Sequence, residues 1–459
     1  MVDFVFGIEN YCEIKYHGPD DHEWNYNWFS NKTVALKNGF DLDGIFQEKT
    51  EIFDPENHDI YYEVIYRGKS RYFSHINVGS YLFNKFSLFP YFRPINDLID
   101  EDKNFLFVID CGDYPTLDNV VLSGKVLEQI RKNRAKVILN TSYEPYSMEK
   151  EDFVIHLNNF ANRFNLNYDN LKIISGNLKV QNDKNRRYEF IPYCYFFEHP
   201  WFIMKDAFFC DEFHDYRNEQ INKEFEENKI KFIDSNRNIK SFWKTVLCYN
   251  RRAHPHRRYL FHELYTDDTI RLNSFISLNN GDRRRHILYD REFGTNEEHS
   301  NRINQFYDEN THNWVFDGEN LDINLATDFN SVYHKNTFVS LVSETTTSDE
   351  IVFFSEKMFK PIYACQPFIL SASRGSLTKL KEFGFKTFDR WWDESYDNEW
   401  TFSGRVDKIK KILYDLISKS DEEKVRMLQE MEEILVHNYE LFTKTNNKYF
   451  FKTFNSIEF

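Results

Sequence analysis

Three consecutive stretches decide the fold class of this chain: FLFVID (residues 105–110), LSGKVLEQIRKNR (122–134) and KVILNTS (136–142). The first and third are uninterrupted apolar runs, which are typical of strands buried on both faces of a sheet. The second has apolar residues at helical spacing and predicts an amphipathic helix. A buried strand, a helix and another buried strand form a βαβ unit, in which the two strands run parallel.

The same alternation continues along the chain. Residues 147–166 predict a helix with Ser147 as its N-cap, and residues 171–178 predict the next strand. A second series is predicted at strand 245–250, helix 255–265, strand-like segment 270–278, strand 337–344, helix 355–365, strand 367–373 and helix 376–384. Pro255 suits the first turn of its helix, and Gly384 ends the last one. Alternating strands and helices favour open parallel sheets.

A charged polar stretch at about residues 214–240 separates the two series, and it has no apolar face wide enough for a core. We therefore predict an α/β domain at 1–235 and a second at 240–403. Two amphipathic patterns within 404–443 predict a C-terminal helical extension at 404–459. The predicted fold class is α/β, with two Rossmann-like doubly wound domains facing a cleft. No topology is predicted for the first hundred residues.

Composition excludes several classes of protein. The 73 acidic and 58 basic residues leave a formal charge of -15, which excludes a globally basic coat for nucleic acid. The six cysteines form no CxxC pair, so we expect reduced, buried thiols. No apolar run approaches the ~18 residues of a membrane span, and the first residues lack the order of a signal peptide. We expect a soluble, cytoplasmic protein without a membrane span.

Basic side chains gather where the strand at 245–250 meets the helix at 255–265. The strand ends at Asn250, and the residues that follow it are Arg251, Arg252, His254, His256, Arg257 and Arg258. Cations at a helix N-terminus oppose the helix dipole unless an anion is present. Helix N-terminal amides and arginine forks both suit phosphate oxygens. The sequence therefore predicts a phosphate site here, with a solvated basic helix start as the alternative.

A second group of polar residues surrounds the end of the strand at 337–344. Glu344 closes this strand, where its carboxylate can accept hydrogen bonds from sugar hydroxyls. Ser355 is a natural N-cap for the next helix, and Glu356 suits its first turn. Lys357 does not complement the helix dipole, so we expect it to meet a ligand phosphate. Because ligands of open α/β sheets bind at the carboxyl ends of strands, both groups belong to one predicted cleft.

Glu144 follows the strand 136–142 and precedes Pro145 in a turn. A carboxylate at a strand end can act as a general base on a hydroxyl if it lies within hydrogen-bond reach. Asp110 and Asp113 follow the first strand and compete for this role, and a solvated loop glutamate is the alternative for Glu144. No metal is predicted: His254, His256 and His262 lack companion ligands at a recognisable spacing, and the arginines repel a cation.

Two segments together carry a resemblance to a known family. LCYNRRAHPHRRYLFHEL (247–264) and LVSETT…FFSEKMFKPIYACQPFIL (341–370) resemble the donor domain of inverting GT-B glycosyltransferases, especially α-1,3-fucosyltransferase-like and exostosin-like enzymes. The segment GFKTFDRWWDESYD (384–397) is similar to one that follows this motif in related proteins from phage-like genomes. The likeness covers about residues 244–400. It departs from the family at Thr345, where the family has Asn after the glutamate.

The resemblance implies a nucleotide-sugar donor domain at 240–403 and an acceptor-side domain at 1–235. It implies that Arg257 or Arg251 and Lys357 bind the donor diphosphate, and that Glu356 binds the ribose hydroxyls. Glu344 occupies the place of the family's Glu-Asn glutamate, and Glu144 is the nearest match to its catalytic base. The implied reaction moves a sugar from a nucleotide diphosphate to a hydroxyl of a glycan or small molecule by inversion, with no cofactor. The alternatives are transfer to hydroxymethylated bases of DNA and a sugar- or nucleotide-binding structural protein without turnover.

Overall fold

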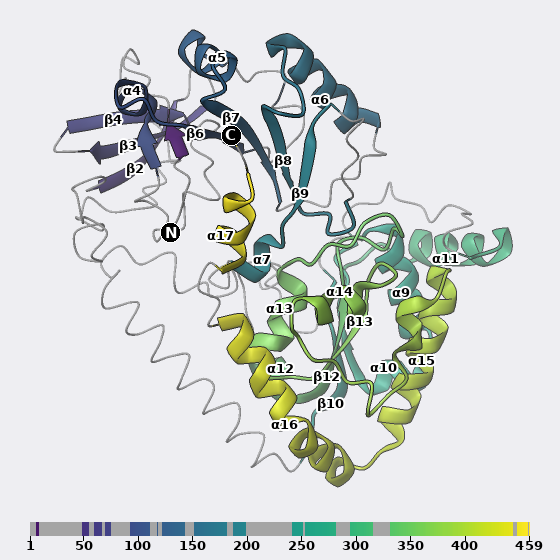
Figure 1. Ribbon diagram of the computed structural model, residues 1–459. Helices are drawn as coiled ribbons and strands as arrows, with labels where there is room; N and C mark the ends of the chain where they lie inside the picture. Colours follow the sequence, from purple (N-terminus) through teal and green to yellow (C-terminus); the bar gives the residue numbers. More distant parts are fainter. Residues whose placement is uncertain are drawn as a thin grey trace. The chain divides into compact units, whose positions relative to one another are not determined.

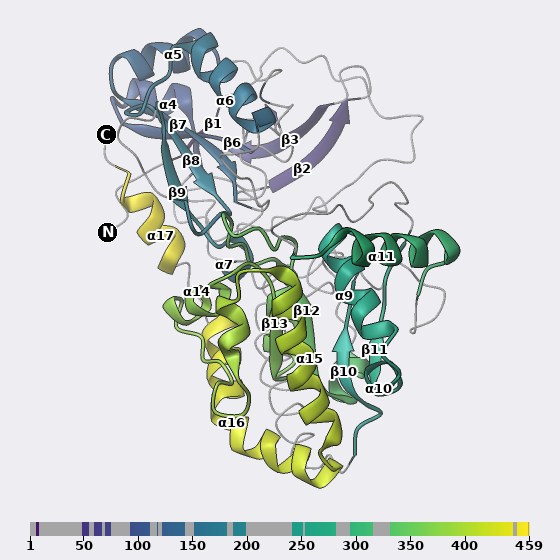
Figure 2. The same cartoon turned by 90° about the vertical axis from the view of Figure 1, so that its right-hand side faces the viewer.

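The computed structural model describes residues 6–8, 48–54, 59–66, 69–74, 92–110, 117, 122–142, 151–180, 187–198, 241–250, 253–280, 294–314, 331–443, 448–457 and 459. These residues divide into two compact units, drawn in Figures 1 and 2. Unit 1 holds the described residues up to Tyr193 and, in addition, the C-terminal helix α17 (Lys448–Asn455). Unit 2 holds α7 (Tyr195–Glu198) and the described residues from 241 to 443.

Unit 1 is built on a six-stranded parallel sheet in the order β5-β1-β6-β7-β8-β9. Its strands are β1 (Phe6–Ile8), β5 (Phe92–Pro94), β6 (Phe105–Asp110), β7 (Ala135–Thr141), β8 (Leu171–Ser175) and β9 (Glu189–Pro192). Its helices, besides α17, are α4 (Ile95–Asp100), α5 (Gly124–Arg131) and α6 (Glu151–Phe164). A separate antiparallel sheet joins β2 (Glu48–Asp54), β3 (Asp59–Tyr66) and β4 (Lys69–Ser74).

One face of the parallel sheet in unit 1 packs against α4, α5 and α6. Phe107, Val137 and Ile173 point to this face, where they join Val126 of α5 and Leu157 of α6 in one apolar cluster. The alternate strand residues, among them Leu106 and Ile138, are buried as well. Burial on both faces explains why these strands read as continuous apolar runs in the sequence.

Unit 2 is built on a four-stranded parallel sheet in the order β11-β10-β12-β13. Its strands are β10 (Lys244–Cys248), β11 (Ser274–Ile276), β12 (Thr337–Ser343) and β13 (Phe368–Ser371). Its helices, besides α7, are α9 (Pro255–Tyr265), α10 (Asp268–Leu272), α11 (Glu297–Glu309), α12 (Ser331–Lys335), α13 (Glu356–Tyr363), α14 (Ser376–Glu382), α15 (Phe402–Ser418) and α16 (Asp421–Thr443), with a short 3-10 turn η6 (Glu394–Asn398).

Helices cover both faces of this second sheet. On one face α15 packs against β10, β13 and α9 (Figure 2). On the other face α13 packs against β12, β13 and α16 (Figure 1). The predicted α/β class, with a Rossmann-like parallel sheet in each of two units and C-terminal helices, is therefore confirmed.

The C-terminal helices do not form a unit of their own. α15 and α16 belong to unit 2, and α17 belongs to unit 1, so the boundary predicted at residue 404 differs from the observed division. The apolar stripe of α15, which includes Val406, Ile409 and Leu413, is buried. Such a stripe is stable only when it packs against another apolar surface. Amphipathic patterning shows that a helix packs, but it does not show on which unit.

Most predicted elements are confirmed within a few residues, and one is wrong in part. Residues 270–278 were expected to be strand-like, but Ile270 to Leu272 end helix α10 and only Ser274–Ile276 form β11. The cause is Asp267, whose side chain accepts the Ile270 N–H and caps this short helix. Ser147, the predicted N-cap of the helix that begins at Glu151, lies outside the described residues.

Composition predicted reduced, buried thiols and no membrane span, and the described residues bear on both. Cys194, Cys248 and Cys365 are buried and form no disulfide, as expected of reduced thiols. None of the described helices has the length and apolar character that crossing a membrane requires.

Candidate functional site

The strand order in the sheet of unit 2 reverses between the neighbouring strands β10 and β12. From β10 the chain passes through α9 to β11 on one side, and from β12 it passes through α13 to β13 on the other side. Such a switch point leaves a crevice outside the carboxyl ends of the two central strands. Both polar groups predicted from the sequence, at the starts of α9 and α13, follow β10 and β12 at this switch point.

Helix α13 begins with a side-chain cap. Ser355 is the N-cap, and its Oγ accepts the Lys357 N–H at 3.3 Å. The same hydroxyl donates to Oε2 of Glu344 at 2.7 Å. The predicted N-cap is confirmed, and it fixes the first turn of α13 to the end of β12.

Glu344 is fully buried and connects the end of β12 to the start of α13 and to the end of β13. Its carboxylate accepts the N–H groups of Ser355 at 3.0 Å and of Thr345 at 2.9 Å, in addition to the Ser355 hydroxyl. Its own N–H donates to the carbonyl of Ser371, the last residue of β13, at 3.0 Å. Burial raises the pKa of Glu344 above its ordinary value, and nearby Lys357 and the Ser355 hydroxyl offset only part of that rise. The hydrogen bonds to Ser355 and Thr345 show that this side chain shapes the loop between β12 and α13.

The backbone carbonyl of Glu344 binds the start of α9. His256 donates from Nε2 to this oxygen at 2.9 Å, because a carbonyl can only accept. Arg257 donates to the same oxygen at 2.9 Å and to the Ser343 carbonyl at 3.3 Å. Burial, with Arg257 beside it, holds the pKa of His256 well below its usual value, so the imidazole is neutral. Arg257, which is 2% exposed, thus links α9 to β12 from within the fold.

Lys357 is the most accessible of the charged groups at the start of α13. Its side chain is 24% exposed, against 10% for Glu356, and its Nζ lies 2.5 Å from Oε1 of Glu356. Burial raises the pKa of Glu356, but Lys357 and Lys360 outweigh it, so the pKa is lowered and the carboxylate stays ionised. Lys357 Nζ also lies 3.4 Å from Ser355 Oγ, so its positive charge stands at the helix start, where the dipole of α13 favours anions.

Asn250, after β10, and Arg258, in the first turn of α9, have internal partners. Asn250 is 1% exposed; its Nδ2 donates to Cys248 Sγ at 3.4 Å, and its N–H donates to Ser277 Oγ at 3.3 Å. Arg258 donates to Oδ1 of Asn280 at 2.9 Å and lies over the ring of Tyr307. These side chains hold α9 and the loop after β11 in place. Their burial was not predicted, because arginine in the first turn of a helix is usually solvated.

Several predicted residues lie outside the described part of the chain. Glu144, Arg251 and Asp113 are among them, and of Asp110 only the backbone at the end of β6 is described. Arg252, from the same basic run, is also outside. The predicted base and the first arginine therefore stay predictions.

The carboxyl ends of β7 and β8 carry buried polar residues that the sequence analysis did not single out. Asn140 Oδ1 accepts the Ser142 hydroxyl at 2.7 Å, and Thr141 donates to the Ile174 carbonyl at 2.9 Å. Ser175 Oγ accepts the Asn177 N–H at 3.2 Å. Polar residues closing a buried strand are a usable signal in the sequence, because a core position rarely holds them without a partner.

No protein-family model matches the sequence, and no curated protein matches it. Five chains among the solved structures match, and three of them follow. The catalytic domain of starch synthase IV from Arabidopsis thaliana, bound to ADP and acarbose, is 10% identical with a TM-score of 0.36, and the match covers 88% of this chain and 86% of that one. The glycosyltransferase WaaG, involved in lipopolysaccharide biosynthesis, is 10% identical with a TM-score of 0.28, covering 69% and 80%. The N-terminal domain of the trehalose-6-phosphate phosphatase of Candida albicans is 12% identical with a TM-score of 0.32, covering 83% and 75%. These values are too low to assign a family.

Proposed function

We propose that this chain is a glycosyltransferase of the GT-B type, which moves a sugar from a nucleotide diphosphate donor to an acceptor hydroxyl. The observation that carries the proposal is the convergence, at the switch point of unit 2, of Ser355, Glu356 and Lys357 with the end of β12 and the start of α9. Two segments 86 to 88 residues apart in the chain meet there through hydrogen bonds. The sequence resemblance places donor-binding residues in the same two segments.

The donor diphosphate would bind at the start of α13. Lys357 and the positive end of the α13 helix dipole would stabilise the charge that grows on the diphosphate as the bond to the sugar breaks. Glu356 would accept hydrogen bonds from the ribose hydroxyls. Arg257 acts as a positioning residue in this proposal, because its described hydrogen bonds go to the carbonyls of Ser343 and Glu344.

The reaction would be a single displacement that inverts the anomeric carbon. The acceptor oxygen attacks this carbon, the bond to the diphosphate oxygen breaks, and Glu144 takes the acceptor proton. Lys357 and the helix dipole would supply the positive charge that a metal supplies in other transferases, so the proposed reaction requires no metal or other cofactor.

A thermal-shift panel of nucleoside diphosphates and nucleotide sugars tests the proposal. A ligand that binds the native state raises its stability by RT ln(1 + [L]/Kd), about 2.7 kcal/mol at one hundred times Kd. We expect one nucleoside diphosphate to raise the melting temperature, and its sugar conjugate to be slowly hydrolysed by the purified protein. A panel without any shift contradicts a donor site. A shift without hydrolysis or transfer contradicts the enzyme and leaves a nucleotide-binding protein.

A further inference from the structure

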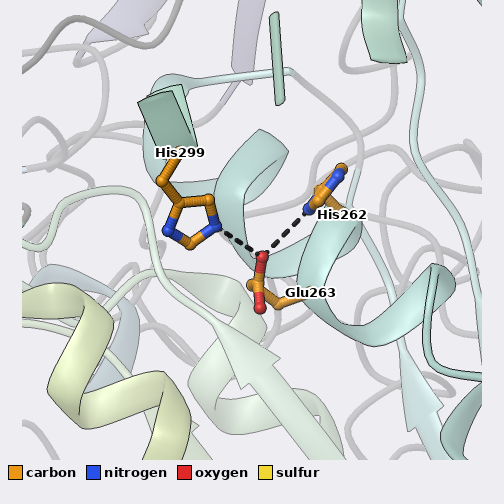
Figure 3. Close-up of side chains that lie close together, drawn as sticks. All are labelled: His262, Glu263 and His299. Carbon is orange, nitrogen blue, oxygen red and sulfur yellow. Dashed lines mark hydrogen bonds and ion pairs between the residues drawn. The ribbon is translucent and has the colours of Figure 1, made fainter. Parts of the chain in front are cut away.

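Two histidines from different helices converge on one carboxylate oxygen in unit 2 (Figure 3). His262 and Glu263 lie in the last turns of α9, and His299 lies in the first turn of α11. Nδ1 of His262 and Nε2 of His299 each lie 3.0 Å from Oε1 of Glu263. The three ligand-type atoms lie within 4.8 Å of one another.

The helix start of α11 holds His299 in this position. Asn296 is the N-cap of α11, and its side chain accepts the His299 N–H at 2.8 Å. The His299 ring also packs beside that of Tyr259, with centroids 5.4 Å apart. The arrangement therefore has its own supports on both helices, which a metal site needs.

Glu263 stays ionised at this place. Burial alone would raise its pKa, but the hydrogen bonds and charges of His262 and His299 lower it to about 2. The side chains of His262, Glu263 and His299 are 7%, 15% and 24% exposed, so the cluster is shielded but within reach of water from one side.

Imidazole nitrogens and a carboxylate oxygen are ligands of zinc and its neighbours in the first transition row, and they do not suit magnesium or calcium. In a tetrahedral zinc site with bonds of ~2.0–2.1 Å, neighbouring ligand atoms are separated by roughly 3.3–3.4 Å. The observed nitrogen–oxygen distances of 3.0 Å are close to that separation. We propose that His262, Glu263 and His299 bind a zinc ion that clamps α11 to α9, with water in the remaining position.

Lys410 of α15 is the neighbouring charge that opposes a cation. Its Nζ lies 3.8 Å from Oε2 of Glu263 and 3.6 Å from Oδ2 of Asp267. Because Asp267 is a second partner, the lysine keeps a carboxylate when Oε1 of Glu263 binds an ion. The lysine also gives a sharp test, since its removal should strengthen zinc binding and weaken a cluster held only by ion pairs.

The experiment is a calorimetric titration of the metal-free, full-length protein with zinc chloride at pH 7.5. We expect a single strong equivalent in the native protein, and binding weaker by at least about tenfold in His299→Gln and Glu263→Gln. Glutamine can still hydrogen-bond at both positions, so these variants keep the cluster together without the ligand. Lys410→Gln should bind zinc more tightly, and His437→Gln on α16 should bind it like the native protein.

A thermal melt with and without zinc adds a second readout, because the ion should stabilise the native protein and not His299→Gln. Equal zinc binding by the native protein and His299→Gln would overturn the proposal, as would no binding at all or weaker binding by Lys410→Gln. Circular dichroism of each metal-free variant identifies one that fails to fold. The proposal does not depend on the glycosyltransferase function, and neither test uses a nucleotide.

Discussion

Lys357 combines three properties that rarely occur together: partial exposure, a fixed contact with a buried carboxylate, and a place in the first turn of a helix that follows a switch-point strand. Each property alone is common on protein surfaces. Together they hold an ammonium group beside Glu356 at the start of the helix that follows β12.

Replacing Lys357 by alanine should reduce donor turnover by about 100-fold or more, the loss seen when one preorganised donor to a developing charge is removed. The fold should survive, because the side chain is partly exposed. Steady-state kinetics with the nucleotide sugar found in the panel measure the effect. Lys379→Ala is the matched control, since Lys379 also pairs with a glutamate, Glu382, but lies on α14. Full activity of the Lys357 variant would refute the assigned role.

Glu263 should give the metal-free protein an acid-sensitive stability. Its folded-state pKa of about 2 lies below the ordinary 4.5, so the ionised carboxylate stabilises the fold above about pH 4.5. That stabilisation, about 3 kcal/mol at most, is lost as the pH falls toward 2. The groups that face it are His262, His299, Lys410 and Tyr259.

Glu263→Gln should therefore unfold more easily at neutral pH and show a flatter pH dependence between about pH 4.5 and 2. Urea unfolding of both proteins in chelator, at a series of pH values, measures the difference. Parallel curves over that window would show that the pKa of Glu263 is not lowered by folding.

At the scale of elements, the junction between α11 and α15 depends on a glycine. Gly294 has a φ of +65°, and a Cβ placed there would lie 2.6 Å from both Ser403 Oγ and Thr401 Cβ. Thr401 is the N-cap of α15, and Ser403 donates to the Gly294 carbonyl at 3.1 Å. The starts of two helices therefore share a space that has no room for a side chain.

Gly294→Ala should lower the free energy of unfolding by about 1–3 kcal/mol, because it adds a left-handed backbone strain and a clash with the α15 cap. Gly124→Ala, in the first turn of α5, is the control. Nothing lies within 4 Å of a Cβ at Gly124, so alanine there should be neutral or stabilising. Chemical unfolding followed by fluorescence compares the two variants. A neutral Gly294→Ala would mean that the helix starts move apart at little cost.

At the scale of the whole molecule, the chain returns to unit 1 at its C-terminus. α15 and α16 cover unit 2, while α17 belongs to unit 1 and contributes the fully buried Phe454. The two units are therefore joined by more than one crossing of the chain. A change in α17 should report on unit 1, although it follows the longest helix of unit 2.

Phe454→Ala should destabilise unit 1 by about 3–5 kcal/mol, the usual cost of removing a buried phenylalanine ring. The shift caused by a nucleoside diphosphate should remain, because its proposed site lies wholly in unit 2. Scanning calorimetry with and without the ligand separates the two effects. If Phe454→Ala abolished the ligand-induced shift and left the unfolding transition of unit 1 unchanged, α17 would stabilise unit 2 and not unit 1.

Local chemistry in the sequence determined the strands at 105–110 and 337–343, the capped start of α13 at Ser355 and the α/β class, because burial on two faces and N-caps leave direct marks on neighbouring residues. The sequence also singled out residues 247–264 and 341–370 of unit 2, which meet through hydrogen bonds in the structure. Tertiary structure alone decided that Arg257 faces inward to the Glu344 carbonyl, that Glu344 shapes a loop, and that His299 meets Glu263. These outcomes depend on which distant residue occupies the neighbouring space, and spacing along the chain carries no record of that.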